Sequence, residues 1–361
     1  MRTLMLGLAG LALLIIGSQT VPARSSSKAI EPPAMLVADL TSIPLGATQP
    51  GSSDAARLMP EPAAAAVAAP VPIQPPVIAA APPRKADALL PPFTSAREAL
   101  VMDEASASVL YAKGLNDRVP PASLTKIATA IVAIEQGNLD RVVTVDVDAR
   151  DFYDSTLMGL RRGDQFTLRD LLYGLMLKSG NNSAVAIGRA VSGSDVAFVQ
   201  QMNATAARLG LKNTHFENPH GLDQPGHYSS AYDIAMLARY GMTLPDFRTI
   251  VDAEKYTAKG SRTIPMESLI SGLLRWVPGS TGIKSGFTDA AGRTLVLSAD
   301  RNGRRLYAVV MNDQQREQDG SNLIEWGFAN HVWGMFVPDT ALVAQPPAED
   351  AGVVRAARAG N

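Results

Sequence analysis

Apolar and polar positions alternate along this chain with two periods, one typical of strands and one typical of helices. The runs at 98–104 and 108–114 flank a short turn and predict a β-hairpin. Further along, the apolar positions follow helical spacing, at Leu124, Ile127, Ala128, Ile131 and Ile134. A Gly-Asn pair at 137–138 ends that pattern, so the sequence predicts a helix that opens at Ser123.

The middle of the chain predicts helices, and its last third predicts strands. Helical patterns occupy further segments at 167–193, with a break at 179–182, and at 194–210, 229–241 and 321–332. Strand patterns occupy 142–149, 280–288, 293–299 and 305–313. Because strands from both ends enclose a helical middle, we expect an α/β (α+β) fold, an antiparallel sheet flanked by helices with an inserted helical subdomain.

The N-terminal residues have the composition of a targeting segment. Residues 1–23 combine Arg2, an apolar run from Leu4 to Ile16, and small residues before Arg24. This pattern predicts a secretory signal peptide, and an uncleaved N-terminal anchor is the alternative. The protein is therefore expected to be exported, to the periplasm or cell envelope, and to meet a membrane only if this segment is retained.

The domain boundaries follow from a shift in composition. More than half of the 25 prolines lie at 24–93, where no periodic apolar face occurs, so this stretch predicts a disordered Pro/Ala-rich linker. The folded catalytic domain is expected at 94–342. A disordered tail is expected at 343–361.

Charge and residue counts exclude several function classes. The net charge is −1 and the basic residues are scattered, which argues against a nucleic-acid partner. With no cysteine there is no disulfide, thiolate nucleophile or Cys-based metal site. Three of the four histidines, His215, His220 and His227, are not spaced as a ligand motif, so no metal and no other cofactor is expected.

Ser123 and Lys126 form the first candidate for chemistry. They are three residues apart at the start of the predicted helix, so they share a face, and the lysine lies beside apolar positions. A serine hydroxyl attacks a carbonyl when a nearby base takes its proton, and burial or a second cation lowers the pKa of a lysine enough for that task. The alternative is a capping serine beside a snorkelling lysine.

Two further segments offer polar groups for the same site. Ser179 and Asn181 lie in the break between two predicted helices, where small polar side chains project into a cleft. Lys284, Ser285 and Gly286 lie on a predicted strand, and the glycine allows close approach of a ligand to the backbone. Each segment is common in unrelated proteins. The evidence for one shared site is the order and the joint spacing of the segments along the chain.

The three segments together resemble the penicillin-recognising serine peptidases, and most closely the D-alanyl-D-alanine carboxypeptidases. That group carries SxxK, SDN and KTG motifs, which correspond here to SLTK at 123–126, SGN at 179–181 and KSG at 284–286. The surrounding stretches resemble the family over nearly all of the folded part, but the segment at 262–282 does not. Ser285 stands where the family usually has threonine, which keeps the hydroxyl. The resemblance implies a β-lactamase/transpeptidase-like fold.

The resemblance also implies a mechanism and a substrate. Ser123 would attack the bond between the two D-alanines of a peptidoglycan pentapeptide stem, with Lys126 as base and Ser179 as proton relay. Asn181 would bind the substrate backbone or orient Lys126. The remaining substrate-binding positions would be the carboxylate-binding and oxyanion-hole residues Lys284, Ser285, Gly286, Phe287 and Thr288. β-Lactam antibiotics would act as covalent inhibitors at Ser123.

Some alternatives stay open. A class A β-lactamase needs a glutamate in an ExxLN-like loop, which is not found between Lys126 and Lys284, and an α/β-hydrolase needs a GxSxG elbow, which is absent. A D,D-endopeptidase that cuts peptidoglycan cross-links uses the same chemistry and is not excluded. Neither is a wall-binding relative that has lost its activity.

Overall fold

The structure, a computed structural model, describes residues 80–86, 89–153 and 155–334. All of them belong to the compact unit that spans 71–361. The signal peptide expected at 1–23 and the tail expected at 343–361 lie outside the described residues, as does most of the linker expected at 24–93.

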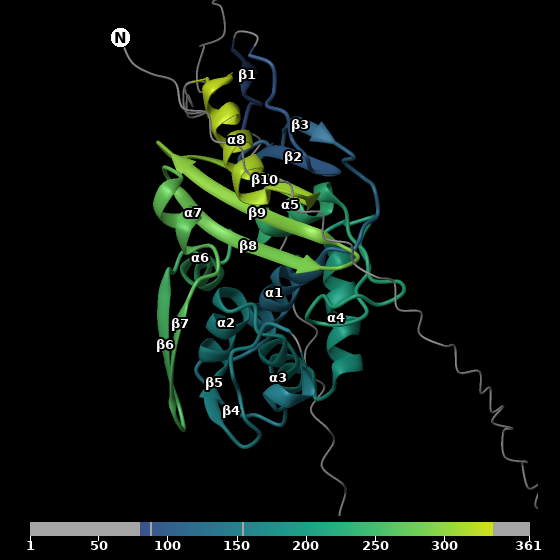
Figure 1. Cartoon of the computed structure of the whole chain (residues 1–361), viewed down its shortest axis with the longest axis vertical. Helices are drawn as coiled ribbons and strands as arrows, with labels where there is room; N and C mark the ends of the chain where they lie inside the picture. Colours follow the sequence, from purple (N-terminus) through teal and green to yellow (C-terminus); the bar gives the residue numbers. More distant parts are fainter. Residues whose placement is uncertain (1–79, 87–88, 154, 335–361) are drawn as a thin grey trace, which may run out of the picture. The chain divides into compact units, whose positions relative to one another are not determined.

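The sheet is antiparallel and has five strands in the order β3-β2-β10-β9-β8. Their bounds are β2 (Glu98–Asp103), β3 (Val109–Lys113), β8 (Ser280–Thr288), β9 (Gly292–Arg301) and β10 (Arg304–Asp313). The predicted hairpin is confirmed as β2 and β3, and the three late strands are confirmed as β8, β9 and β10. Strands from both ends of the domain thus build one sheet, and β8 forms its edge beside the helices (Figure 1).

The helical subdomain lies against one face of this sheet. Its helices are α1 (Lys126–Gln136), α2 (Leu168–Leu177), α3 (Asn181–Ser192), α4 (Asp195–Arg208), α5 (Ala231–Gly241) and α6 (Pro245–Val251). The predicted break at 179–182 is real, because α2 ends two residues before Ser179 and α3 begins at Asn181. The capping pair of α2 is also present: Thr167 and Asp170 satisfy each other's backbone N–H groups.

Two hydrophobic cores use opposite faces of the sheet. Side chains alternate along β10, so that Tyr307, Val309 and Met311 join the core of the helical subdomain. The intervening Leu306, Ala308 and Val310 join a second, smaller core. That core is covered by α7 (Ser271–Trp276) and α8 (Arg316–Ala329), which pack on the other face. Ile283 of β8 belongs to the larger core, so the substrate-binding candidates that follow it on this strand lie beside that core.

The start of α1 differs from the prediction. Ser123 does not open the α-helix; it lies in a 3₁₀ turn, η1 (Ala122–Thr125), and α1 begins at Lys126. The reason is the backbone before it, because Ala122 adopts a positive φ of 50° and turns the chain sharply into the helix. Ser123 also makes no side-chain cap, so the capping interpretation of this serine is wrong.

Several short elements were not predicted. They are β1 (Arg84–Lys85), η2 (Ala149–Asp151), β5 (Gln165–Thr167), β6 (Lys255–Lys259), β7 (Thr263–Glu267) and β11 (His331–Val332), together with α6 and α7. The predicted strand that begins at Val142 is present as β4 (Val142–Thr144). The strand expected at 142–149 is only three residues long, and the last helix begins at Arg316 instead of Ser321. Strand β1 lies within the stretch expected to be linker, at 24–93, and it pairs with β11 at the end of the helix expected at 321–332.

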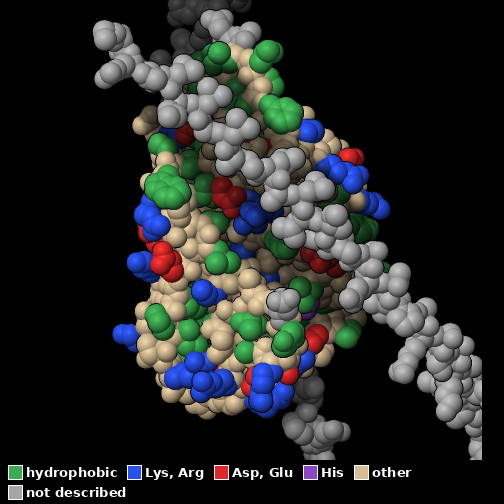
Figure 2. Space-filling model, in the orientation of Figure 1, with side chains coloured by type: hydrophobic (Ala, Val, Ile, Leu, Met, Phe, Trp, Pro, Cys, Tyr) green, Lys and Arg blue, Asp and Glu red, His purple; other side chains and the backbone are tan. Residues whose placement is uncertain are grey.

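Surface charge on the face drawn in Figure 2 is mixed. Lys and Arg side chains alternate with Asp and Glu over the sheet and its helices, and apolar side chains lie between them. Among the described residues, no helix is long and apolar enough to cross a lipid bilayer.

Candidate active site

Ser123 and Lys126 meet at the bottom of a cleft. The Lys126 amine, Nζ, lies 2.9 Å from Ser123 Oγ, as the spacing of three residues requires. Lys126 has no exposed surface, whereas Ser123 is partly exposed and reaches the cleft. The lysine is therefore sealed behind the serine, and the serine hydroxyl separates its amine from solvent.

The other contacts of Lys126 define what its amine can do. Asn181 Oδ1 accepts a hydrogen bond from Nζ at 2.7 Å, and the carbonyl oxygen of His220 accepts a second one at 2.5 Å. Neither oxygen can donate, whereas the Ser123 hydroxyl can do both. A neutral amine has two hydrogens for these two acceptors, and its lone pair is then left to receive the hydrogen of Ser123. The contact set thus suits an uncharged lysine acting as base.

Burial and a nearby positive charge also favour the neutral form of the Lys126 amine. Burial lowers the pKa of Lys126 well below its usual value, and the positive charge of Lys284 lowers it further. Lys284 is itself almost fully buried, at 1% exposed. Burial, with help from the charge of Arg316, lowers the pKa of Lys284 to about 7. Two lysines with lowered pKa values in one cleft mark this as a candidate catalytic centre.

Strand β8 forms the wall opposite the helices. Lys284 and Ser285 are buried on it, and Lys284 Nζ donates to the Ser285 carbonyl oxygen at 2.6 Å. A Cβ atom on Gly286 would lie 2.8 Å from the backbone nitrogen of Ser123, closer than real contacts allow. The missing side chain therefore lets the strand lie directly against the backbone of Ser123.

The connection between α2 and α3 supplies the third wall. Ser179 has a positive φ of 55° and is 3% exposed at the edge of the cleft. Thr156 holds this turn from outside, since its hydroxyl donates to the Ser179 carbonyl oxygen at 2.7 Å and its own carbonyl accepts from Asn181 N at 2.9 Å. The turn is fixed, and it presents Ser179 and Asn181 to the same space.

These walls enclose a cleft of about 740 Å³. Seven of the nine residues expected at the site line it: Ser123, Ser179, Asn181, Ser285, Gly286, Phe287 and Thr288. The two lysines lie behind this lining. Phe287 is 60% exposed at the rim. Segments more than 160 positions apart in the chain are thus brought together in one site.

Thr288 is engaged by a residue that the sequence did not single out. Its hydroxyl donates to Asp223 Oδ1 at 2.7 Å and accepts from the backbone nitrogen of Ala291 at 3.1 Å. Asp223 Oδ2 also accepts from the nitrogen of Ala290, at 3.2 Å. With its only hydroxyl hydrogen used, Thr288 holds the β8–β9 turn in place and does not offer a free donor to a ligand.

Sequence reasoning missed four groups at the site. They are the carbonyl of His220, the side chains of Asp223 and Thr156, and Arg316, which donates to the Gly286 carbonyl oxygen at 2.5 Å. A backbone carbonyl leaves no trace in a residue pattern. Arg316 stands alone at the N-terminus of α8, and nothing local indicates that it faces β8. Among the described residues, no group of three His, Asp or Glu side chains is placed to hold a metal ion.

Comparison with known proteins places this geometry in a family. Residues 85–315 match the D-alanyl-D-alanine carboxypeptidase family of peptidases. D-alanyl-D-alanine carboxypeptidase DacD of Escherichia coli is 38% identical over 256 residues, which cover 66% of this chain and 65% of that protein. DacF of Bacillus subtilis is 31% identical over 244 residues, covering 65% of this chain and 63% of that protein. The chain thus spans just under two thirds of the length of these curated relatives.

Solved structures agree with the sequence matches. The Streptomyces K15 DD-transpeptidase superposes with a TM-score of 0.64 and 33% identity, over 67% of this chain and 100% of that one. Penicillin-binding protein 6B of Escherichia coli gives a TM-score of 0.62 and 37% identity, over 66% of this chain and 79% of that one. The expected penicillin-binding fold is thereby confirmed. This chain belongs to the D-alanyl-D-alanine carboxypeptidase family of serine peptidases.

Proposed function

We propose that this protein is a serine D-alanyl-D-alanine carboxypeptidase that removes the terminal D-alanine from peptidoglycan pentapeptide stems. The observation that carries the proposal is the buried Lys126 amine, 2.9 Å from Ser123 Oγ, with two further acceptors that use up the hydrogens of a neutral amine. Both residues belong to an SxxK motif in a chain of the carboxypeptidase family.

The first step would acylate the serine. Ser123 Oγ attacks the carbonyl carbon between the two D-alanines while its proton passes to Lys126 Nζ. The C–N bond of the resulting tetrahedral intermediate then breaks, and the leaving D-alanine amine takes up a proton through Ser179. This leaves the stem peptide as an ester on Ser123. A water molecule attacks that ester by the reverse sequence of proton transfers and restores the free serine.

Two backbone N–H groups would hold the negative charge that develops on the carbonyl oxygen, those of Ser123 and Phe287. The contact between Gly286 and the Ser123 nitrogen supports this arrangement, because it holds the two backbone segments close together. The substrate's terminal carboxylate would bind near Lys284 and Ser285. The pKa of Lys284, which burial lowers to about 7, would rise when that anion binds.

Other assignments follow from this proposal. Asn181 orients Lys126 through its side-chain oxygen Oδ1. The side-chain nitrogen Nδ2 of Asn181 is then left to bind the substrate backbone. Thr288 positions the β8–β9 turn through Asp223. β-Lactams, which mimic the D-Ala-D-Ala terminus, would acylate Ser123, and the resulting ester would be hydrolysed slowly. The proposed place of action is the periplasm or cell envelope, after export by the segment at 1–23.

A D,D-endopeptidase is the second candidate. The cleft is open enough for it, since Phe287 at the rim is 60% exposed and the cleft volume is about 740 Å³. A cross-linked peptide needs room on both sides of the scissile bond, whereas a pentapeptide ends just after it. The chemistry is identical in the two reactions, so only the choice of substrate separates them.

The test offers both substrates to the full-length protein. Mass spectrometry follows pentapeptide monomers and cross-linked dimers incubated with the wild type and with Ser123→Ala. Loss of one alanine from the monomer, absent in the variant, is the expected result. Cleaved dimers would assign the endopeptidase activity instead. No product from either substrate, with no covalent β-lactam adduct, would mean that the protein is an inactive relative.

A further inference from the structure

A second groove opens beside the catalytic cleft, between α7 and α8. Its volume is about 470 Å³. Leu269, which is 53% exposed, lines both this groove and the cleft that holds Ser123. On the α8 side, Arg316 lines the cleft and the next residue, Glu317, lines the groove. A ligand bound in the cleft and extending past Leu269 would therefore enter this groove without leaving the protein surface.

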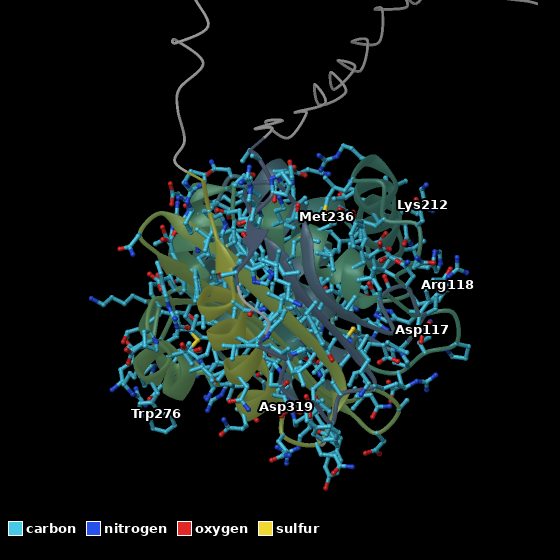
Figure 3. All side chains as sticks on the ribbon, turned by 90° about the horizontal axis from the view of Figure 1, so that it is seen from above. Asp117, Arg118, Lys212, Met236, Trp276 and Asp319 are labelled. Carbon is cyan, nitrogen blue, oxygen red and sulfur yellow. The ribbon has the colours of Figure 1, made fainter. Side chains whose placement is uncertain are left out.

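Trp276 forms an aromatic platform at the outer wall of the groove. Its side chain is 78% exposed, and Figure 3 places it at the periphery of the molecule. A Cβ atom on Gly272 would lie 3.1 Å from the indole ring, so the ring rests on the bare backbone of α7 and keeps its other side open. The other tryptophans differ, because the indole N–H groups of Trp326 and Trp333 donate to groups of the protein itself.

The wall that α8 contributes to the groove is polar but electrically balanced. The amide and hydroxyl side chains on α8 are those of Gln318, Ser321 and Asn322. Both carboxylates of the groove are paired with arginines, Glu317 with Arg316 and Glu325 with Arg301. An exposed aromatic ring facing neutral amides and hydroxyls suits an uncharged ligand that has an apolar ring face and polar edges.

We propose that the α7–α8 groove binds the N-acetylated glycan strand to which the stem peptide is attached, with one sugar ring stacked on Trp276. This inference rests on the proposed function, since a stem peptide in the cleft is covalently joined to such a strand. A sugar ring has one face of C–H bonds for the indole, and its amide and hydroxyl groups pair with the α8 side chains. A charged polymer would lack a counter-charge here, because the arginines are already paired.

The kinetic test compares a substrate with and without its glycan. Trp276→Ala is expected to raise KM for pentapeptide carried on glycan strands roughly three- to tenfold, with kcat unchanged. KM and kcat for the free pentapeptide should stay at wild-type values. Trp276→Phe should restore most of the loss, because it keeps an aromatic face. Val196→Ala, at a residue that is 69% exposed on α4, is the matched control and should change neither substrate.

A binding test separates this inference from the proposed function. Peptide-free glycan strands are titrated into full-length Ser123→Ala protein while the indole N–H resonance of Trp276 is followed by NMR. A saturable shift of this resonance is expected whether or not the enzyme releases D-alanine, and Trp276→Ala identifies the resonance because it removes it. No shift of that resonance would overturn the inference, and so would equal KM increases for the free and the glycan-linked peptide. An enzyme that binds the strands yet releases no alanine would contradict the proposed function alone.

Discussion

Lys126 and Lys284 show how one cleft can hold two amines with different tasks. Both are buried, but Lys126 bonds to Ser123, Asn181 and the His220 carbonyl, whereas Lys284 bonds to the carbonyl of Ser285. Burial depresses both pKa values, and the Lys284 charge adds to the effect on Lys126. The amine nearest the serine is thus the one held most firmly in its neutral form, as a base requires.

The coupling between the two lysines predicts a shift in the pH profile. Lys284→Met removes a positive charge, so the pKa of Lys126 should rise and the limb on which activity increases with pH should move to higher pH. The rate of acylation by a β-lactam, measured from pH 5 to 10, reports this limb. Lys259→Met, at an exposed lysine on β6, serves as control. An unmoved limb in Lys284→Met would show that burial alone sets the pKa of Lys126.

Glu98 predicts a pH dependence of stability that is separate from catalysis. It is fully buried on β2, and burial raises its pKa to about 7 despite the ion pair with Arg97. Its folded pKa lies above the unfolded value, so its contribution to stability is present below about pH 4.5 and lost as the pH rises through about 7. Glu98→Gln should therefore stabilise the protein at pH 8, by up to roughly 3 kcal/mol, and have little effect at pH 4.

Thermal unfolding of wild type and Glu98→Gln at these two pH values measures the difference. An equal change in Tm at both pH values would mean that the pKa of Glu98 is the same in the folded and the unfolded protein, so that burial does not raise it.

At the scale of elements, β8 and η1 act as one unit. The strand carries the carboxylate-binding candidates, and the turn carries the proposed nucleophile Ser123, with Ala122 in the left-handed conformation before it. Their contact is so close that Gly286 has no room for a side chain. The edge position of β8 leaves one side of the strand unpaired in the sheet, so its backbone can face a substrate in the cleft.

This contact predicts a severe effect from one methyl group. Gly286→Ala should push β8 away from Ser123 and disturb the backbone N–H groups of the proposed oxyanion hole, with a fall in acylation rate of about 100-fold or more. Stopped-flow acylation by a β-lactam measures the rate, and circular dichroism checks that the sheet is retained. A variant that acylates at the wild-type rate would show that the close approach has no role in catalysis.

The elements that the sequence predicted are those with a local signature. The β2–β3 hairpin, the strands β8 to β10 and the capping pair of α2 all carry their own periodicity or end signals. The 3₁₀ turn at Ser123 was taken for α-helix because the apolar spacing continues through it, and only the φ of Ala122 separates the two. Helix α7 is six residues long and is held by packing under α8, which no local pattern records.

The sequence predicted the side chains of the candidate site but not their main-chain partners. The side chains of the three motifs could be named because their types and spacing are specific, and the structure brings them to one cleft. The His220 carbonyl and the clamp of Thr156 on Ser179 could not, because main-chain acceptors become partners only once distant segments are folded together. The burial of Lys126 agrees with its place beside apolar positions in the sequence.

At the scale of the whole molecule, the two cores have different duties. The larger core packs beneath Ser123 and includes Leu124, whereas the smaller one lies on the far face of the sheet and includes Leu306. Both leucines are fully buried. The geometry of the site therefore depends on the larger core, whereas the stability of the sheet depends on both cores.

A matched pair of substitutions separates these duties. Leu124→Ala and Leu306→Ala should each destabilise the protein by about 2–5 kcal/mol, because each leaves a cavity. Only Leu124→Ala should also lower kcat for D-alanine release, since the cavity lies one residue from Ser123. Chemical unfolding and steady-state kinetics on both variants test this. Equal losses of kcat would mean that the sheet transmits the disturbance from either face.

The pairing of β1 with β11 gives the domain a mechanical property. Arg84 lies opposite Val332 and Lys85 opposite His331, so the chain enters and leaves the domain side by side. Tension applied between these two ends would act across the short ladder and separate its two residue pairs one after the other, beginning with Arg84 and Val332. The five-stranded sheet and the cleft would carry no load until β1 and β11 had separated. The two-residue ladder would therefore open before tension along the chain reached the five-stranded sheet.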